Sequence, residues 1–187
     1  DGVITAGTGS VRIKIAVGAA GQVFLAIIGP SNNQRLAEGF RSPDGVTGWA
    51  ALGVPTTTEQ NGVLFGAHPG GQGSIHLSIG ADGTDSNIVY IGGDRQPYFG
   101  EGVSGSVSFF PNSIGAGDYS GRLFRGDASA AAGLRWTPLT HVGAGGNSAP
   151  HADSRDMAID AQGNLLESDD GGIYKRGTPR TTTGAWV

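Results

Sequence analysis

Residues 150–176 read PHADSRDMAIDAQGNLLESDDGGIYKR and contain three short strand-like runs separated by two tight turns. The runs are 156–159, 164–167 and 173–176, and the turns between them are 161–163 and 169–172. Short runs of this kind, joined by turns that contain glycine, predict antiparallel strands arranged as a meander. We therefore predict an all-β fold.

Degenerate copies of this segment occur at two earlier places in the chain, so we predict a repeat protein. An aromatic residue followed by a base recurs as Phe40-Arg41, Phe124-Arg125 and Tyr174-Lys175, each followed by a tryptophan, at position 49, 136 or 186. Upstream of each pair, the equivalent repeat position carries a similar triplet. The three matched triplets are Ile15-Ala16-Val17, Leu77-Ser78-Ile79 and Met157-Ala158-Ile159. The repeats span approximately 11–54, 75–140 and 154–187 of a single domain, 1–187, and the second repeat carries an insertion at 96–118.

The first repeat shows its strands most clearly. Apolar and polar residues alternate over 11–17, which predicts a half-buried strand, and a glycine turn leads to a continuous apolar run at 23–28. After an expected turn at 30–33, a third strand is predicted at 36–41 and a fourth near Trp49. Each repeat is therefore expected to contribute four short antiparallel strands.

The composition agrees with this class and excludes several functions. Glycine supplies 35 of 187 residues and charged residues only 15%, as expected for many short strands joined by glycine turns. The net charge of -4 disfavours nucleic-acid binding, and no apolar run is long enough to span a membrane. The chain has no cysteine, which excludes disulfides and thiolate sites. Low lysine content with abundant glycine, threonine and serine favours an extracellular or cell-surface location.

Residues 42–49, SPDGVTGW, resemble the Asp-box, or BNR repeat, whose pattern is S-x-D-x-G-x-T-W, and depart from it at Val46 and Gly48. Residues 169–174, DDGGIY, are similar to the strand that precedes an Asp-box in many members of this family. Asp-box repeats build β-propellers, among them sialidases and xyloglucan-cleaving glycoside hydrolases. The resemblance implies a β-propeller segment of about three four-stranded blades. Such a ring is incomplete unless the chain is part of a longer polypeptide or copies of it associate.

The resemblance also implies structural roles for a set of residues. They are Ser42, Asp44, Trp49, Trp136, Asp170, Gly172 and Trp186. In such a motif an aspartate accepts backbone N–H bonds within a hairpin, a glycine permits the turn, and a tryptophan packs between neighbouring sheets. We expect these residues to serve folding rather than activity.

The connection into the third repeat carries the most suggestive polar residues, His151, Asp153 and Asp156. An imidazole and carboxylates can bind a divalent metal, for which His151 and Asp153 are the candidates, and Asp153 or Asp156 can act as a catalytic acid or base. In related propellers a second histidine stands where this chain has Arg155. We therefore favour the interpretation that these side chains bind loop backbone or a ligand, with His151, Asp153 and Arg155 as the binding residues.

Two further acidic groups permit alternative interpretations. Asp169 and Asp170 are a carboxylate pair by sequence, but adjacent residues of a strand point to opposite faces, so we favour a turn-capping role. Asp82, Asp85 and Asn87 offer oxygen ligands for calcium, although the same residues form ordinary turns. We favour the turn and predict no cofactor, with calcium as the divalent cation that remains an alternative.

The insertion at 96–118 carries aromatic residues among glycines. Tyr98 and Phe99, with Phe109 and Phe110, suit stacking on sugar rings if they are exposed. The alternative is an additional hairpin that packs onto the domain, with 107–110 as one of its strands. The sequence leaves these two possibilities equal.

Two functions of different class follow. The preferred one is a non-catalytic binding or scaffolding module of a secreted or surface bacterial protein, with a glycan or a protein as ligand. Its structural partners are the remaining blades of a longer chain or a second copy of itself. The alternative is part of a glycoside hydrolase of the sialidase or xyloglucanase kind that uses acidic residues near His151.

Overall fold

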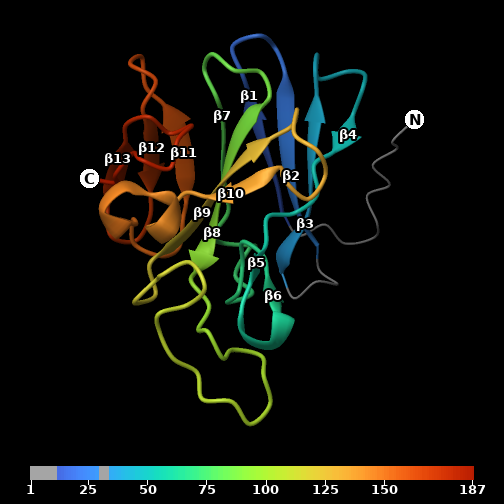
Figure 1. Ribbon diagram of the computed structural model, residues 1–187. Coiled ribbons are helices and arrows are strands. Elements are labelled where there is room, and N and C mark those ends of the chain that lie inside the picture. The colour runs from blue at the N-terminus through green and yellow to red at the C-terminus, as the bar shows by residue number, and fades with distance from the viewer. Residues whose placement is uncertain (1–11, 30–33) are drawn as a thin grey trace.

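The computed structural model describes residues 12–29 and 34–187, so the predicted strand residue Val11 and the expected turn at 30–33 lie outside the described residues. The described residues form antiparallel β-sheets in which hydrogen-bonded neighbours follow one another along the chain (Figure 1). The predicted all-β class with antiparallel sheets is confirmed. Within the same ranges, no helix is long and apolar enough to cross a membrane.

Three of the sheets are successive meanders. The first sheet contains β1 (Arg12–Val17), β2 (Val23–Gly29), β3 (Arg35–Ser42) and β4 (Ala50–Ala51). The second contains β7 (Ser78–Ala81), β8 (Ile88–Arg95), β9 (Gly121–Asp127) and β10 (Trp136–Pro138). The third contains β11 (Asp156–Ile159), β12 (Leu165–Ser168) and β13 (Ile173–Arg176), and an isolated bridge joins Arg176 to Trp186.

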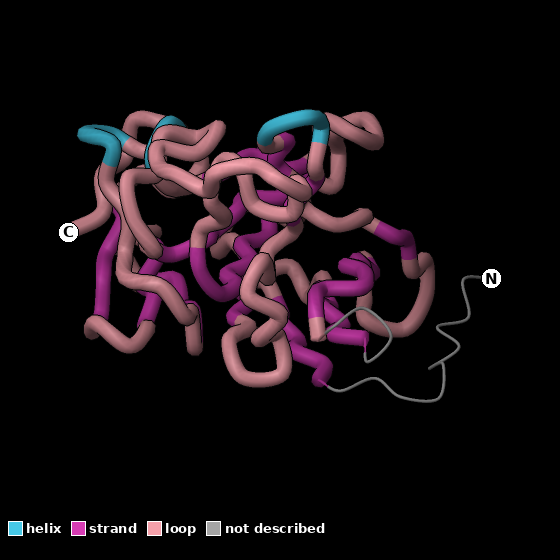
Figure 2. Tube along the Cα trace, turned by 90° about the horizontal axis from the view of Figure 1, so that it is seen from below, coloured by secondary structure: helices cyan, strands magenta, loops and turns pink. Residues whose placement is uncertain are grey.

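The sequence did not predict the short elements between these sheets. A small sheet of β5 (Thr57–Thr58) and β6 (Leu64–Phe65) lies in the connection between the first and second sheets. The helical segments of the described residues are the short 3-10 turns Gln60–Gly62, His141–Gly143 and Gly145–Asn147 (Figure 2).

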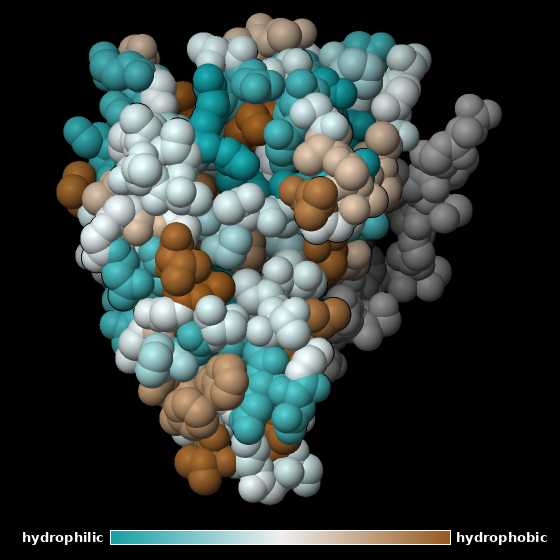
Figure 3. All heavy atoms as spheres, viewed as in Figure 1, coloured by the Kyte–Doolittle hydropathy of each residue, from teal (hydrophilic) through white to brown (hydrophobic). Residues whose placement is uncertain are grey.

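Two other predictions differ from the structure. β7 begins at Ser78 rather than at Ile75, because the N–H groups of Ile75 and His76 donate to the carbonyl of Gln72 and hold these residues in a turn. The hairpin alternative for the insertion is wrong: residues 96–120 form a loop without a strand at 107–110. Hydrophobic side chains gather at the tip of this loop, at the lower end of the molecule (Figure 3).

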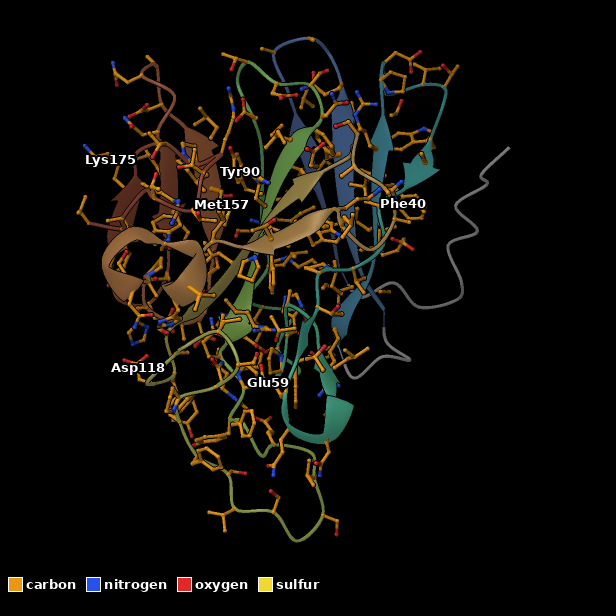
Figure 4. The ribbon with its side chains drawn as sticks, viewed as in Figure 1. Phe40, Glu59, Tyr90, Asp118, Met157 and Lys175 are labelled. Carbon is orange, nitrogen blue, oxygen red and sulfur yellow. The ribbon has the colours of Figure 1, made fainter. Side chains whose placement is uncertain are left out.

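The first strands of the three meanders lie next to one another, so that the sheets stack face to face. β7 contacts both β1 and β11 (Figure 1). Lys14 on β1 reaches Asp156 on β11, with 3.2 Å between Nζ and Oδ1. One hydrophobic cluster lies between the first and second sheets, and another, which includes Tyr90 and Met157, lies between the second and third (Figure 4). The core is therefore divided into two layers, each shared by successive sheets.

Equivalent tryptophans make the same contact across these two layers. The Trp136 indole Nε1 donates to the carbonyl of Leu52 at 3.3 Å, and the Trp186 Nε1 donates to the carbonyl of Leu139 at 2.8 Å. Leu52 follows Trp49 by three residues, as Leu139 follows Trp136. The second and third sheets are therefore each tied to the preceding sheet through the same pair of repeat positions.

Arg122 on β9 fixes the small sheet to the second sheet. Its side chain is fully buried, and its guanidinium donates to the carbonyls of Phe65 and Gly66 and to the side chains of Thr57 and Gln96. Burial lowers the pKa of Arg122 to about 10, against the raising effect of acidic groups such as Glu59, so the side chain stays charged at neutral pH. A buried cation held mainly by carbonyl and amide oxygens requires all of these acceptors to remain in place.

The turn at 42–49 is held by hydrogen bonds to the side chain of Asp44. Asp44 accepts hydrogen bonds from the N–H groups of Val46 and Thr47 and from the Thr47 hydroxyl. These bonds hold the pKa of Asp44 well below its usual range. Gly45 has φ +76, a left-handed conformation that favours glycine. The turn is thus closed by its own residues.

Candidate functional site

A hollow of about 370 Å³ lies below the third sheet in the view of Figure 4, close to Asp118. We call it the lower hollow. It is lined by the end of the insertion, the connection into the third sheet and β13, through Asp118, Tyr119, Ser120, Ala149, Pro150, His151 and Tyr174. Loops carried on rigid sheets are where binding residues commonly lie.

A serine and a histidine meet at the wall of the lower hollow. The Ser120 Oγ lies 2.6 Å from the Nε2 of His141, a residue 21 positions farther along the chain. The His141 side chain is only 5% exposed, and its backbone has φ 56, a left-handed conformation uncommon outside glycine. The N–H of Ser120 donates to the Asp118 Oδ1 at 3.0 Å. The Ser120 hydroxyl is therefore held between the open hollow and a fixed imidazole.

The surroundings of His141 favour the neutral ring. Burial lowers the pKa of His141, and the carboxylate of Asp118 and the oxygens of Asn147 oppose this shift only in part. The Nδ1 atom is buried without a hydrogen-bond partner of ordinary geometry among the described residues. A neutral imidazole next to a hydroxyl can accept its proton.

The structure places His151 and Asp153 in different surroundings. His151 lines the lower hollow, and its Nδ1 is 3.2 Å from the carbonyl of Ala152. Asp153 instead faces the buried His76, with 3.6 Å between its Oδ1 and the Nε2 of His76. Among residues 12–29 and 34–187, no group of three His, Cys, Asp or Glu side chains is arranged to hold a metal ion.

Arg155 and Asp156 also point away from a common site. Arg155 pairs with Asp170 at 2.7 Å on the exposed surface, and Asp156 pairs with Lys14. Asp153 and Asp156, the candidate catalytic carboxylates, therefore contact different partners. Asp170 forms this surface pair, and the neighbouring Gly172 adopts φ 146.

A carboxyl pair that the sequence did not predict consists of the buried Glu167 and the partly buried Asp169. Glu167 is buried on β12, and its pKa is raised to about 8, first by burial and also by the neighbouring Asp169. Asp169 also caps the next turn, because its Oδ1 accepts the N–H bonds of Gly171 and Gly172. The signal in the sequence is the i, i+2 spacing, which puts two side chains on one face of a strand. Because Glu167 is inaccessible, this pair suits structure better than catalysis.

The calcium alternative concerns Asp82, which is already occupied by protein donors. Its carboxylate pairs with Arg180 and accepts hydrogen bonds from the Tyr90 hydroxyl and from the N–H groups of Thr84 and Asp85. The side-chain bond from Arg180 is the main factor that holds the pKa of Asp82 well below its usual range against the effect of burial. Asp82 also borders a larger hollow of about 790 Å³ between the turns 82–84, 159–164 and 177–181.

The aromatic residues of the insertion pack mostly against one another. Tyr98 lies 4.8 Å from Phe110 and 5.3 Å from Tyr119 between ring centroids, and Phe99 lies 5.2 Å from Phe109. Tyr98 and Phe99 are partly buried, while Phe109 and Tyr119 are close to half exposed. Of the aromatic side chains considered, Tyr119 is the one that borders the lower hollow together with Tyr174.

No protein-family model matches the chain, and no curated protein is similar to it in sequence.

Proposed function

We propose that the chain is a three-sheet segment of an Asp-box β-propeller and that it acts as a scaffolding and binding module of a secreted or cell-surface protein. One observation carries this proposal. Residues at the same repeat position are buried in the second sheet, buried or partly buried in the third, and exposed in the first. An apolar sheet face that is exposed in the first sheet, although its equivalents are covered by a neighbouring sheet, indicates an interaction surface.

The matched triplets show the difference directly. Leu77 is 0% exposed and Ile79 5%, because the first sheet covers them, whereas their counterparts Ile15 and Val17 are 62% and 66% exposed. These two side chains lie on an apolar surface that we call the open face. It comprises Ile13, Ile15, Val17, Val23, Leu25, Ile27 and Phe40.

Trp49 supports the same interpretation. Trp136 and Trp186 each donate an indole N–H to a carbonyl of the preceding sheet. The Trp49 indole, at the equivalent position, has no acceptor among residues 12–29 and 34–187. A preceding sheet of the same kind would provide both the cover for the open face and a carbonyl for Trp49.

We assign a second copy of this chain as the occupant of the open face. Ala158 holds the repeat position of Ala16, and Leu166 lies opposite Ala158 as the buried Phe24 lies opposite Ala16. The first sheet covers the second sheet through Ala16 and Phe24. The outer face of the third sheet carries the equivalent pair, Ala158 and Leu166. Two copies, each placing its third sheet on the open face of the other, would close a ring of six sheets.

The lower hollow is the surface that we propose for a ligand, with a glycan as the class that suits the rings of Tyr119 and Tyr174. The glycoside hydrolase alternative is less well supported, because retaining or inverting cleavage needs two accessible carboxyl groups facing one substrate. Asp153 and Asp156 contact different partners, and Glu167 is buried.

The test is the absolute molar mass in dilute solution, measured by light scattering after size exclusion. We expect twice the chain mass of 18.9 kDa, with dissociation on dilution. A single-chain mass at every accessible concentration would overturn the assignment of a second copy and would direct the search to other polypeptide segments as the cover.

A further inference from the structure

We propose that Ser120 is a nucleophile activated by His141 and that the lower hollow takes a carboxylic ester as substrate. This inference goes beyond the scaffolding and glycan-binding role. An ester-linked acyl group on a glycan satisfies both proposals for the lower hollow, and the open face is not involved. It begins from the 2.6 Å contact between the Ser120 Oγ and the His141 Nε2. A serine hydroxyl is a weak nucleophile until an adjacent base accepts its proton.

The protonation of His141 fits the role of that base. Burial lowers the pKa of the ring, so the imidazole is neutral at pH 7. When Nε2 accepts the Ser120 proton, the proton of the neutral ring is on Nδ1, and the oxygens of Asn147 favour a proton on the ring. The structure thus provides a serine and an adjacent base, the first two members of a catalytic triad, while the Nδ1 of the ring has no hydrogen-bond partner among the described residues.

Ser120 can be reached from the lower hollow, which distinguishes the Ser120–His141 pair from a buried structural hydrogen bond. Ser120 lines the lower hollow, whereas His141 is buried behind it. The volume of about 370 Å³ lies within the range of small-ligand sites, roughly 300–1,000 Å³. Tyr119 and Tyr174 border the same space and provide flat surfaces for the alcohol part of an ester.

The reaction is acyl transfer to water. The Ser120 Oγ attacks the ester carbonyl carbon while its proton moves to the His141 Nε2, which gives a tetrahedral alkoxide. The alkoxide collapses, the bond to the alcohol oxygen breaks, and His141 returns the proton to that oxygen. Water then attacks the acyl-serine with the same assistance, which releases the acid and restores Ser120.

The alkoxide oxygen needs hydrogen-bond donors at the hollow. The backbone N–H groups of Ala149 and His151, two residues that line it, donate to no described residue. Backbone N–H groups that are free of other partners are the usual donors to such an oxygen. We assign this role to them.

The alternative is that Ser120 merely provides a hydrogen-bond partner for a buried imidazole. Reactivity separates the two, because a serine that is not activated does not react with a fluorophosphonate. The folded chain would be incubated with diisopropyl fluorophosphate and the adduct located by peptide mass spectrometry. We expect one adduct, on Ser120, absent in Ser120→Ala and formed at least tenfold more slowly in His141→Gln.

Ser113 is a matched internal control, since its hydroxyl lies 2.7 Å from the carboxylate of the buried Glu59 and has no imidazole partner. No adduct is expected there. If His141→Gln does not fold, the wild-type chain is compared before and after unfolding in urea, and only the folded form is expected to react. No adduct on Ser120, or equal labelling of the folded and unfolded chains, would overturn the proposal without affecting the mass measurement above.

Discussion

The open face predicts how strongly two copies of the chain depend on Ile15 and Val17. Complete burial of such a side chain contributes about 1.5–3 kcal/mol. Because 62% of Ile15 and 66% of Val17 are exposed, covering them would contribute about 1–2 kcal/mol for each residue. A ring of two copies contains each contact twice, so truncating both residues would remove roughly 5 kcal/mol of the association free energy.

The perturbation is the double variant Ile15→Ala with Val17→Ala. At about 1.4 kcal/mol for each tenfold change, its dimer dissociation constant is expected to rise by roughly a thousandfold or more. Sedimentation equilibrium over a dilution series measures this constant. The single chain should keep its thermal unfolding midpoint, because both side chains are exposed in it.

Two controls make the result specific. Val142 is 64% exposed on a 3-10 turn away from the meander faces, so Val142→Ala should leave the dissociation constant unchanged. Leu77→Ala, at the repeat position of Ile15 but buried, should destabilise the fold itself by about 2–5 kcal/mol. Equal dimer affinity in the wild type and the Ile15/Val17 variant would refute the argument from repeat positions.

Three further predictions concern contacts between and within the sheets. Trp186→Phe removes the indole bond to Leu139 and should lower the free energy of unfolding by about 1 kcal/mol in urea titrations, whereas Trp49→Phe should change it by less than half as much in the single chain. Because the pKa of Glu167 is raised in the folded state, this residue should reduce stability as pH rises from about 5 to about 8, by at most about 1.4 kcal/mol per pH unit, and Glu167→Gln should remove that slope. Asp82→Asn should cost about 1–3 kcal/mol at pH 7, measured by thermal unfolding, and the difference from wild type should shrink as pH falls below about 4, because the carboxylate is then protonated in the unfolded chain before it is protonated in the folded one.

Repetition is the part of the fold that the sequence predicts well. The matched triplets and the aromatic–basic pairs locate strands of the three meanders because residues of the same type recur in the same order in each repeat. The boundary of β7 was misplaced because Ile75 is apolar but exposed, so hydropathy alone extends the strand. The short β5 and β6 strands carry no alternation long enough to detect.

The candidate site was harder to predict because its residues belong to different segments. Ser120 and His141 are 21 positions apart and meet because the strands between them, β9 and β10, pair antiparallel and bring the chain back to its starting point. The His151 region was identified from its composition, and one of its residues does line the lower hollow. Composition does not reveal the direction of a side chain, which is why Asp153 and Asp156 were grouped although they face different partners.

The buried guanidinium of Arg122 limits how this architecture can diverge. Its acceptors include Thr57 and the carbonyls of Phe65 and Gly66, all in a connection that otherwise resembles a replaceable linker. A deletion there would leave a cation without partners in the interior, at a cost that can exceed the stability of a small domain. The segment 57–66 and the residue at position 122 are therefore expected to vary together in any natural or engineered variant.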